Sequence, residues 1–371
     1  MHERENGRSL RSQFSANGFP MTNDYASWAL FEALDDARHI QGMALDAIGL
    51  GPIEAPYETI FRSPGASLRR YGTGPGPAVL IVPAPIKRSY IWDLAPEASA
   101  VRRLLAAGAS VLLLDWERTA EPVGLAEYAD PLIRETLDAG GIDRAVLLAH
   151  SLGGLFAALY PERVRGLGLL ATPLHFERGV GIFSAMVEAL PGQQLPPSVP
   201  GSFLSAASFR AAPVTFGWER LLDFGASLGA PEALATHLRV ERWTLDESPL
   251  PGPLVADLAE HLARDDAFVR GTLTLGGRLA APSQVTAPLL CVVDPRCRVV
   301  PPAAVLPFLE AASSSDKTLL HYDGDVGVSL QHVGMLVGPQ AHARLWPQIT
   351  GWVRRCAEAD DAARTRFDAA A

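Results

Sequence analysis

Cysteine is scarce in this chain of 371 residues: Cys291, Cys297 and Cys356 are the only three, and they are far apart in the sequence. An odd number at this spacing fits neither a disulfide framework nor the paired CxxC spacing of a structural metal site. We therefore expect a reducing compartment, by default the cytoplasm, with no bound metal ion and no cofactor.

Basic residues and long apolar runs are also lacking. There are 32 lysines and arginines against 41 acidic residues, which gives a net charge of -9 at pH 7. Binding to a phosphate backbone needs a basic surface, so nucleic acid is not expected as a partner. No run approaches the length of a membrane span, and the residues before Met21, an alternative start, carry charges without the apolar centre of an export signal. We expect no transmembrane segment and an unstructured beginning.

The composition is instead that of a globular protein, with 48% hydrophobic and 20% charged residues, which excludes a wholly disordered chain. From about Pro56, short apolar runs alternate with helix-like segments, as in a parallel sheet with crossover helices. The first two of eight expected strands form an antiparallel edge hairpin, and the last six are apolar enough to be buried on both faces. The eight strands are Thr59–Arg62, Ser67–Tyr71, Ala78–Val82, Ser110–Leu114, Ala145–Ala149, Gly166–Leu170, Leu289–Val293 and Thr318–Tyr322.

More than a hundred residues separate the sixth and seventh strands and break this alternation. A long insertion at one end of a parallel sheet is the place for a cap over a binding site. The resulting division is an N-terminal segment (1–55, partly disordered and then helical), a core (56–171 and 288–355), a cap (172–287) and a C-terminal tail (356–371). Within the cap, residues 232–262 are expected to be largely helical, with a break between Pro249 and Pro253.

The most informative stretch is LLAHSLGGLFAALY, residues 147–160. A buried strand runs directly through Ser151 into an apolar helix, and the small residues Ala149 and Gly153 lie two positions before and after the serine. This pattern predicts a nucleophile elbow, a strained turn that lifts the serine out of the sheet. The backbone N–H of Leu152, at the helix N-terminus, would then face an oxyanion formed at Ser151.

A serine nucleophile needs a base. In proteins with a nucleophile elbow of this kind, the catalytic histidine follows the last strand of the sheet. His332 is in that place. His321 falls inside the last expected strand, and His150 more plausibly shapes the elbow than moves protons. The second oxyanion donor should come from the loop after the third strand, where Pro83 and Pro85 have no N–H; this leaves Ala84 or Ile86.

The chain resembles the polyhydroxyalkanoate synthases, especially the short class that works with a second subunit. The resemblance rests on VPAPIKRSYIWDLAPEASAVRRLLAAG, VLLLDWERTAEP, YPERVRGLGLLATPLHFE, VERWTLDESP, DDAFVRGTLTLGGR and HVGMLVGPQAHARLWPQITGWV, in family order between about residues 57 and 354. It implies an α/β-hydrolase fold with a mostly parallel eight-stranded sheet, helices on both faces and a cap inserted after the sixth strand. It also implies acyl transfer from a hydroxyacyl-coenzyme A, a cap-mediated homodimer, and Ile86 as the second oxyanion donor.

Several family positions are changed. Ser151 stands where the family has a nucleophilic cysteine, Cys297 where it has the acidic Asp, His175 where it has another Asp, and Gln331 before the histidine where it has Gly. An oxygen ester on Ser151 would have lost the activation of the thioester, so hydrolysis would be favoured over repeated transfer to hydroxyl groups. Serine also depends on its base at the moment of attack. We therefore expect a hydrolase or a single-turn acyltransferase rather than a processive polymerase.

The carboxylate that should orient His332 is the open question, since its loss can cost about 10⁴ in rate. Asp294, directly after the seventh strand, is the first candidate, followed by Glu177 and by Asp323 or Asp325; a site with no acid is the remaining alternative. Lys87 and Arg88, near the expected mouth, are equally compatible with binding an anionic coenzyme or carrier phosphate and with being solvated surface charges. Two alternatives to the hydrolase remain: a polyester synthase that uses 3-hydroxyacyl-coenzyme A, and a catalytically silent scaffold or granule-associated subunit.

Overall fold

The computed structural model describes residues 25–72, 74, 76–160, 162–188, 190 and 195–370. The stretch before Met21, expected to be unstructured, lies outside these residues. The first described element is the helix α1 (Tyr25–Ala47), and the chain then enters the main sheet. No helix of the described part of the chain is long and apolar enough to cross a membrane.

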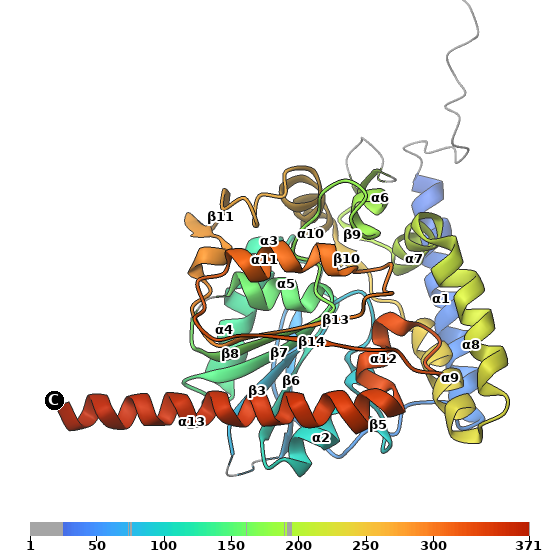
Figure 1. Cartoon of the computed structure of the whole chain (residues 1–371). Helices are drawn as coiled ribbons and strands as arrows, with labels where there is room; N and C mark the ends of the chain where they lie inside the picture. The colour runs from blue at the N-terminus through green and yellow to red at the C-terminus, as the bar shows by residue number, and fades with distance from the viewer. Residues whose placement is uncertain are drawn as a thin grey trace, which may run out of the picture.

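The centre of the molecule is an eight-stranded sheet in the order β1-β2-β6-β3-β7-β8-β13-β14 (Figure 1). The strands β1 and β2 form an antiparallel hairpin, β2 runs antiparallel to β6, and the remaining neighbours are parallel. The predicted fold class and the predicted edge hairpin are confirmed. The strands are β1 Glu58–Ser63, β2 Ala66–Gly72, β3 Ala78–Val82, β6 Ser110–Trp116, β7 Ala145–His150, β8 Val164–Leu170, β13 Leu289–Val293 and β14 Lys317–His321.

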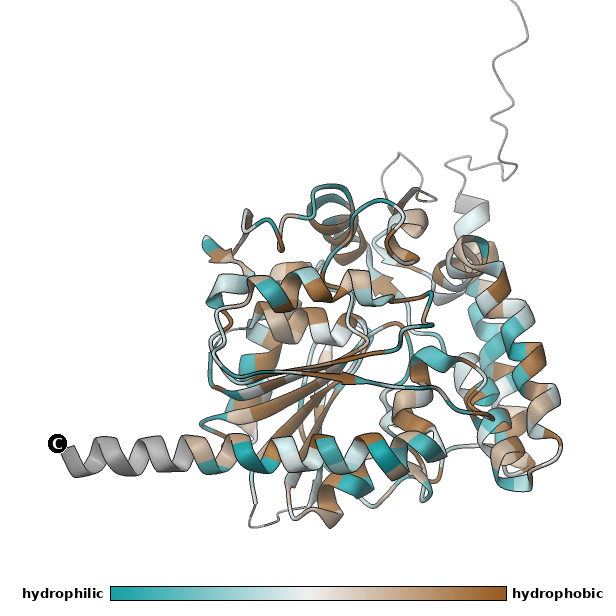
Figure 2. Ribbon diagram, in the orientation of Figure 1, coloured by the Kyte–Doolittle hydropathy of each residue, from teal (hydrophilic) through white to brown (hydrophobic). Residues whose placement is uncertain are grey.

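Helices cover both faces of this sheet, as Figure 1 shows. One face carries α2 and α13, and the other carries α4 and α5. The core between them consists of the apolar strand residues, which appear as brown strands in Figure 2. The helices and short elements of the core are β4 Asp93–Ala95, β5 Ala98–Ser99, α2 Ala100–Ala106, α3 Leu125–Ala129, α4 Pro131–Ala139, α5 Leu152–Leu159, α11 Leu306–Ala311, α12 Gln331–Val337, α13 Trp346–Ala370 and the short helices η1 Ser89–Trp92, η5 Pro302–Ala304 and η6 Ala341–Leu345.

The last strand differs from its expected environment. The residues of β14 alternate between exposed and half-buried, and Leu319 is 38% exposed, so this strand is not buried on both faces. The reason is its place at the edge of the sheet, where it has β13 on one side only. Burial of an apolar strand depends on its position in the sheet as well as on its composition.

The segment between β8 and β13, here called the cap, lies over one end of the sheet and beside α1 (Figure 1). Its helical region breaks between Thr244 and Gly252, where a two-residue strand separates α9 from α10. The break thus starts before the predicted interval between Pro249 and Pro253 and ends within it. The elements of the cap are α6 Phe183–Glu188, β9 Ser198–Val199, α7 Gly201–Ala211, η2 Val214–Glu219, α8 Arg220–Ser227, α9 Pro231–Thr244, β10 Leu250–Pro251, α10 Gly252–Asp257, η3 Leu258–Arg264, β11 Leu273–Leu275, β12 Arg278–Ala280 and η4 Pro282–Gln284.

Candidate active site

Ser151 lies at the sharp turn between β7 and α5. Its backbone has φ 54° and ψ -133°, a region that residues other than glycine rarely adopt, so the turn is strained. Two positions directly after the turn, 153 and 154, have room only for glycine. A side chain at Gly153 would collide with the backbone of Val82 and Pro83 at the end of β3, and one at Gly154 would collide with Thr172. The close approach of neighbouring strand ends thus fixes the elbow.

The two expected oxyanion donors flank this turn. Leu152 is the first residue of α5, so its N–H has no partner within the helix. Ile86 lies in the loop after β3 and lines the same cavity as Ser151, and its carbonyl accepts the N–H of Ser248 at 2.9 Å. Ala84, the other residue left by elimination, lines the cavity too. The loop that would supply the second donor is therefore tied to the cap.

The structure brings His332 to the wall of the cavity that Ser151 lines. His332 is the second residue of α12, and its carbonyl interacts with Nε2 of His150 at 2.9 Å. The two imidazole rings lie 4.6 Å apart. Burial, together with the neighbouring His150, holds the pKa of His332 well below its usual value, and burial lowers the pKa of His150 to about 4. Both rings are consequently neutral at neutral pH, as a general base must be.

The group beside His332 is a thiol. The sulfur of Cys297 lies 3.8 Å from Nδ1 of His332, and no described carboxylate forms a hydrogen bond with this ring. Burial raises the pKa of Cys297 to about 11, so the thiol is uncharged at neutral pH. Asp294 is fully buried and accepts the N–H of Arg296 at 2.8 Å, but the structure does not bring it to His332.

The other candidate acids have different partners. Glu177 lies 3.4 Å from His175 with a largely exposed side chain. The carboxylate of Asp325 accepts the N–H groups of Gln340 and Ala341, and Asp323 is exposed. None of these carboxylates contacts His332 among the described residues, so the site has a nucleophile and a base without a charged third member.

The loop that precedes His332 is held by hydrogen bonds to two cap helices. Asp223, on the cap helix α8, accepts the N–H of Gly327 at 2.9 Å and that of Ser329 at 2.7 Å, and it pairs with His237 on α9 at 2.8 Å. The Ser329 hydroxyl also bonds to Glu241 of α9. The α8–α9 hairpin therefore fixes the segment that leads into α12 and His332.

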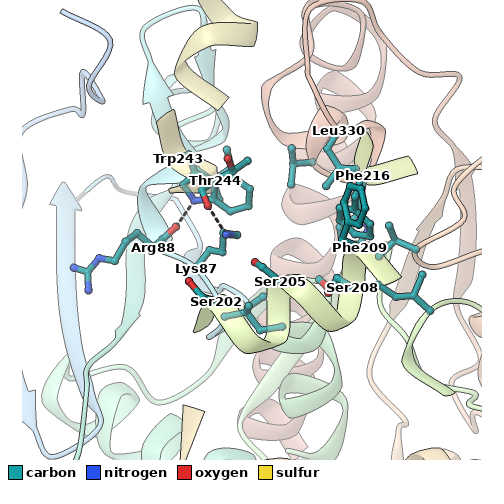
Figure 3. A pocket seen from close by; sticks show the side chains of 18 of the residues that line it. Lys87, Arg88, Ser202, Ser205, Ser208, Phe209, Phe216, Trp243, Thr244 and Leu330 are labelled. Carbon is teal, nitrogen blue, oxygen red and sulfur yellow. Dashed lines mark hydrogen bonds between the residues drawn. The ribbon is translucent and has the colours of Figure 1, made fainter. Parts of the chain in front are cut away.

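The cavity at this site has a volume of about 480 Å³ and two chemically different ends (Figure 3). Lys87, Trp243 and Thr244 lie at one end, and an apolar wall faces them across the cavity. Three serines of α7 lie along the cavity between the two ends. The apolar wall is marked by Phe209, Phe216 and Leu330, and the serines are Ser202, Ser205 and Ser208.

The sequence left open whether Lys87 is a solvated surface charge, and in the structure it is not. Its side chain is only 17% exposed, and its ammonium donates to the carbonyl of Thr244 at 2.5 Å and to Glu247 at 3.0 Å. The cause is the cap, which packs its α9 end over the loop after β3. The sequence also gave no sign that Phe31 and Arg38 of α1 line the cavity. Contacts between a leading helix and a distant cap leave no local pattern.

The parallel sheet with its antiparallel hairpin, the strained serine after β7 and the histidine after β14 define an α/β-hydrolase fold. The solved structure of a monoacylglycerol lipase from Paleococcus ferrophilus has the same fold: it matches 78% of this chain and 99% of its own at 19% identity, with a TM-score of 0.50. No family model matches the chain.

Within this class the chain is similar in sequence to the polyhydroxyalkanoate synthases, and the predicted resemblance is confirmed. The chain is 26% identical to the poly(3-hydroxyalkanoate) polymerase subunit PhaC of Allochromatium vinosum, over 87% of this chain and 96% of that protein. The subunit of the same name from Thiocystis violacea is 25% identical, over 83% of this chain and 90% of its own. That of Haloferax mediterranei is 28% identical over 74% of this chain but only 58% of that protein.

Proposed function

We propose that this protein is a serine-dependent acyl-transfer enzyme that forms an acyl-enzyme on Ser151. Its substrate would be an ester or thioester of a hydroxyacyl or similar acyl group, which it hydrolyses or transfers once. The observation that carries the proposal is the strained Ser151 at the β7–α5 turn, which lines one cavity together with the neutral His332.

The residues support a two-step mechanism. The hydroxyl oxygen of Ser151 attacks the carbonyl carbon while His332 takes its proton, and the oxyanion accepts the N–H groups of Leu152 and Ile86. Collapse of this intermediate breaks the bond to the leaving alcohol or thiol, which takes the proton from His332. Water or another acceptor then loses a proton to His332, attacks the acyl-serine and releases the product with Ser151 restored.

The thiol of Cys297 weakens this machinery without abolishing it. For His332 to accept a proton at Nε2, its other nitrogen must carry a proton and donate it. A carboxylate beside Nδ1 enforces that tautomer and stabilises the imidazolium, whereas a neutral thiol can either accept from Nδ1 or donate to it. We infer a slow enzyme whose rate is limited by the proton transfers.

Hydrolysis is favoured over polymerisation because the acyl group on Ser151 would be an ordinary ester. Its transfer to another hydroxyl releases little free energy, and water competes at high concentration. The names of the polymerase relatives favour the alternative, a synthase acting on 3-hydroxyacyl-coenzyme A. The uncharged residue at the acid position favours a second alternative, a silent scaffold.

We also propose that the protein acts in the cytoplasm as a homodimer formed through the cap. The support is a set of exposed apolar side chains on η2, on α8 and directly after α8, each at least 42% exposed: Val214, Trp218, Leu221, Leu222 and Leu228. Sedimentation should show a dimer for the wild type and a monomer for the variant Leu221→Lys/Leu222→Lys. A wild-type monomer at all concentrations would exclude this part of the proposal.

The deciding experiment is intact-protein mass spectrometry after exposure to a fluorophosphonate, with Ser151→Ala, His332→Ala and Ser208→Ala as variants. Ser208 lines the same cavity, and its hydroxyl is bonded to the Leu204 carbonyl, so it is a matched control. We expect one adduct on the wild type and on Ser208→Ala, and none on the other two. With 3-hydroxybutyryl-coenzyme A we expect free acid; polymer would establish the synthase, and no adduct on folded protein would establish the scaffold.

A further inference from the structure

The ammonium group of Lys87 is held inside the cavity (Figure 3). Two of its three N–H groups are accounted for by the Thr244 carbonyl and by Glu247. The third N–H has no hydrogen-bond acceptor among the described residues, although the ammonium nitrogen lies 6.0 Å from the centroid of the Trp243 ring. A buried ammonium with a remaining donor that faces an open cavity is a binding group for an oxygen atom of a ligand.

The charges around Lys87 do not balance. Arg38 lies 3.1 Å and Lys87 lies 3.0 Å from the same oxygen of Glu247, so two cations share one carboxylate. Arg220 lies nearby but is paired with Glu241. The cavity wall contains no carboxylate among the described residues, and a further cation that lines it, Arg88, is paired with Asp115. Uncompensated buried charge is costly, so this end of the cavity favours an anion.

A hydroxyl beside this cluster lacks a partner. The oxygen of Ser202 is buried and has no hydrogen bond among the described residues. Figure 3 shows Ser202 and Ser205 on the face of α7 that is turned toward Lys87. The Ser205 hydroxyl already bonds to Glu247. Ser202 is thus a second donor next to the ammonium, and buried polar groups are normally satisfied.

We propose that Lys87, Arg38 and Ser202 form a subsite for a carboxylate on the acyl part of the substrate. The apolar remainder would lie against Phe209, Phe216 and Leu330 at the other end of the cavity. This inference rests on the proposed function and names its substrate class, an amphipathic acyl ester or thioester that carries a carboxylate a few bonds from the reacting carbonyl.

The phosphates of coenzyme A are the other source of anionic oxygen. Lys87 directly follows Ile86, the expected oxyanion donor, and both residues line the cavity that Ser151 lines. The phosphates of the coenzyme are separated from the thioester by the whole pantetheine arm and lie too far away. The anion at Lys87 therefore belongs to the acyl group.

The test compares succinyl and butyryl monoesters of the same simple alcohol, which differ only in the terminal carboxylate. We expect wild-type kcat/KM to be higher for the succinyl ester, and the succinyl-to-butyryl ratio to fall about tenfold or more in Lys87→Met, since a charge-assisted hydrogen bond is lost. Lys87→Arg should keep most of the ratio. Arg88→Met is the matched control, because the Arg88 guanidinium points away from Lys87 and pairs with Asp115.

The same preference should depend on pH. Burial lowers the pKa of Lys87 to about 8; Glu247 opposes this shift, while Arg38 and Arg220 add to it. The ammonium is present below this pKa, so the succinyl preference should decline as the pH rises through about 8.

Three results would overturn the subsite: a wild-type enzyme that prefers the butyryl ester, a ratio unchanged in Lys87→Met, and a Lys87 effect seen only with coenzyme A thioesters. Fluorophosphonate labelling of Ser151 in Lys87→Met establishes that the variant is folded and its nucleophile intact. Hydrolysis of neither ester, together with no labelling of the wild type, would instead count against the proposed function itself.

Discussion

The sulfur of Cys297 has two polar neighbours: it lies 3.8 Å from Nδ1 of His332 and accepts the N–H of Val300 at 3.4 Å. The loop after β13 therefore presents an imidazole and a backbone donor to the side chain of residue 297. A carboxylate would be a stronger acceptor for both groups than a neutral sulfur. The surroundings of residue 297 would therefore suit an acidic side chain, but the chain has a cysteine at this position.

Cys297→Asp should accordingly raise the activity. The new carboxylate would accept from Nδ1 of His332, fix the reactive tautomer and stabilise the imidazolium, and we expect kcat to rise about tenfold or more. Ester hydrolysis under saturating substrate measures this directly. Cys297→Asn, of the same size and uncharged, is the matched control and should give no gain. An unchanged or lower kcat in a folded Cys297→Asp would show that the third position does not limit the reaction.

Asp223→Asn should impair His332 from a distance. Asparagine has one acceptor oxygen in place of two, so one of the N–H groups of Gly327 and Ser329 would face an amide N–H instead. A small displacement of a catalytic group can cost about a hundredfold, and we expect kcat to fall by about ten- to a hundredfold with little change in KM.

Asp257→Asn is the comparison for this variant, because Asp257 also lies on the cap and accepts a backbone N–H, that of Leu125, away from His332. It should lose stability without a selective loss of kcat, and Asp223→Glu should recover part of the rate. Equal effects of the two asparagine variants on kcat would mean that Asp223 has only a structural role.

The pH profile should reflect the neutral state of His332. Burial places the pKa of this ring well below 6.5, so the base is already unprotonated there. As the pH falls, kcat/KM should stay level through 6.5 and decline only at lower pH, where His332 becomes protonated. Stopped-time assays of a neutral ester in overlapping buffers would measure the profile. An inflection at the ordinary histidine pKa would show that the ring is solvated during catalysis.

Gly153→Ala should damage the elbow. The added methyl group would meet the carbonyls of Val82 and Pro83, so the end of β3 and the start of the oxyanion loop must shift. Overpacking of this kind typically costs about 1–3 kcal/mol of stability. We expect a lower melting temperature together with a larger loss of fluorophosphonate labelling than Gly225→Ala shows, since Gly225 on α8 has open space around it. Equal labelling in both variants would contradict the tight approach.

Local sequence predicted the parts of this structure that local physics determines. The buried strands are apolar runs of the right length, and Ser151 stands between a strand and a helix with glycine where backbones converge. The edge position of β14 was not predictable, because Leu319 and Leu320 read like any buried pair until the order of strands is known. A local pattern shows which residues are apolar, whereas the exposure of their side chains depends on neighbours that are distant in sequence.

The site shows the same division. Ser151 and His332 were identified from the elbow and from chain order, and the structure places both on one cavity. Asp223 is an acidic residue on a cap helix, a position where such residues are usually solvated, and its role depends on two N–H groups about a hundred residues away. The direction of Lys87 likewise depends on the carbonyl of Thr244, which the cap brings to it from a distant part of the chain.

The helix α1 has a consequence for how the protein is made. Asp35 of α1 accepts the N–H groups of Gly201 and Ser202, and Trp28 and Phe31 pack on Phe203, so every one of these partners leaves the ribosome long after α1 does. During synthesis, the apolar side of α1 stays exposed until α7 has been made. A nascent chain with α1 exposed is therefore a target for chaperones until α7 has been made.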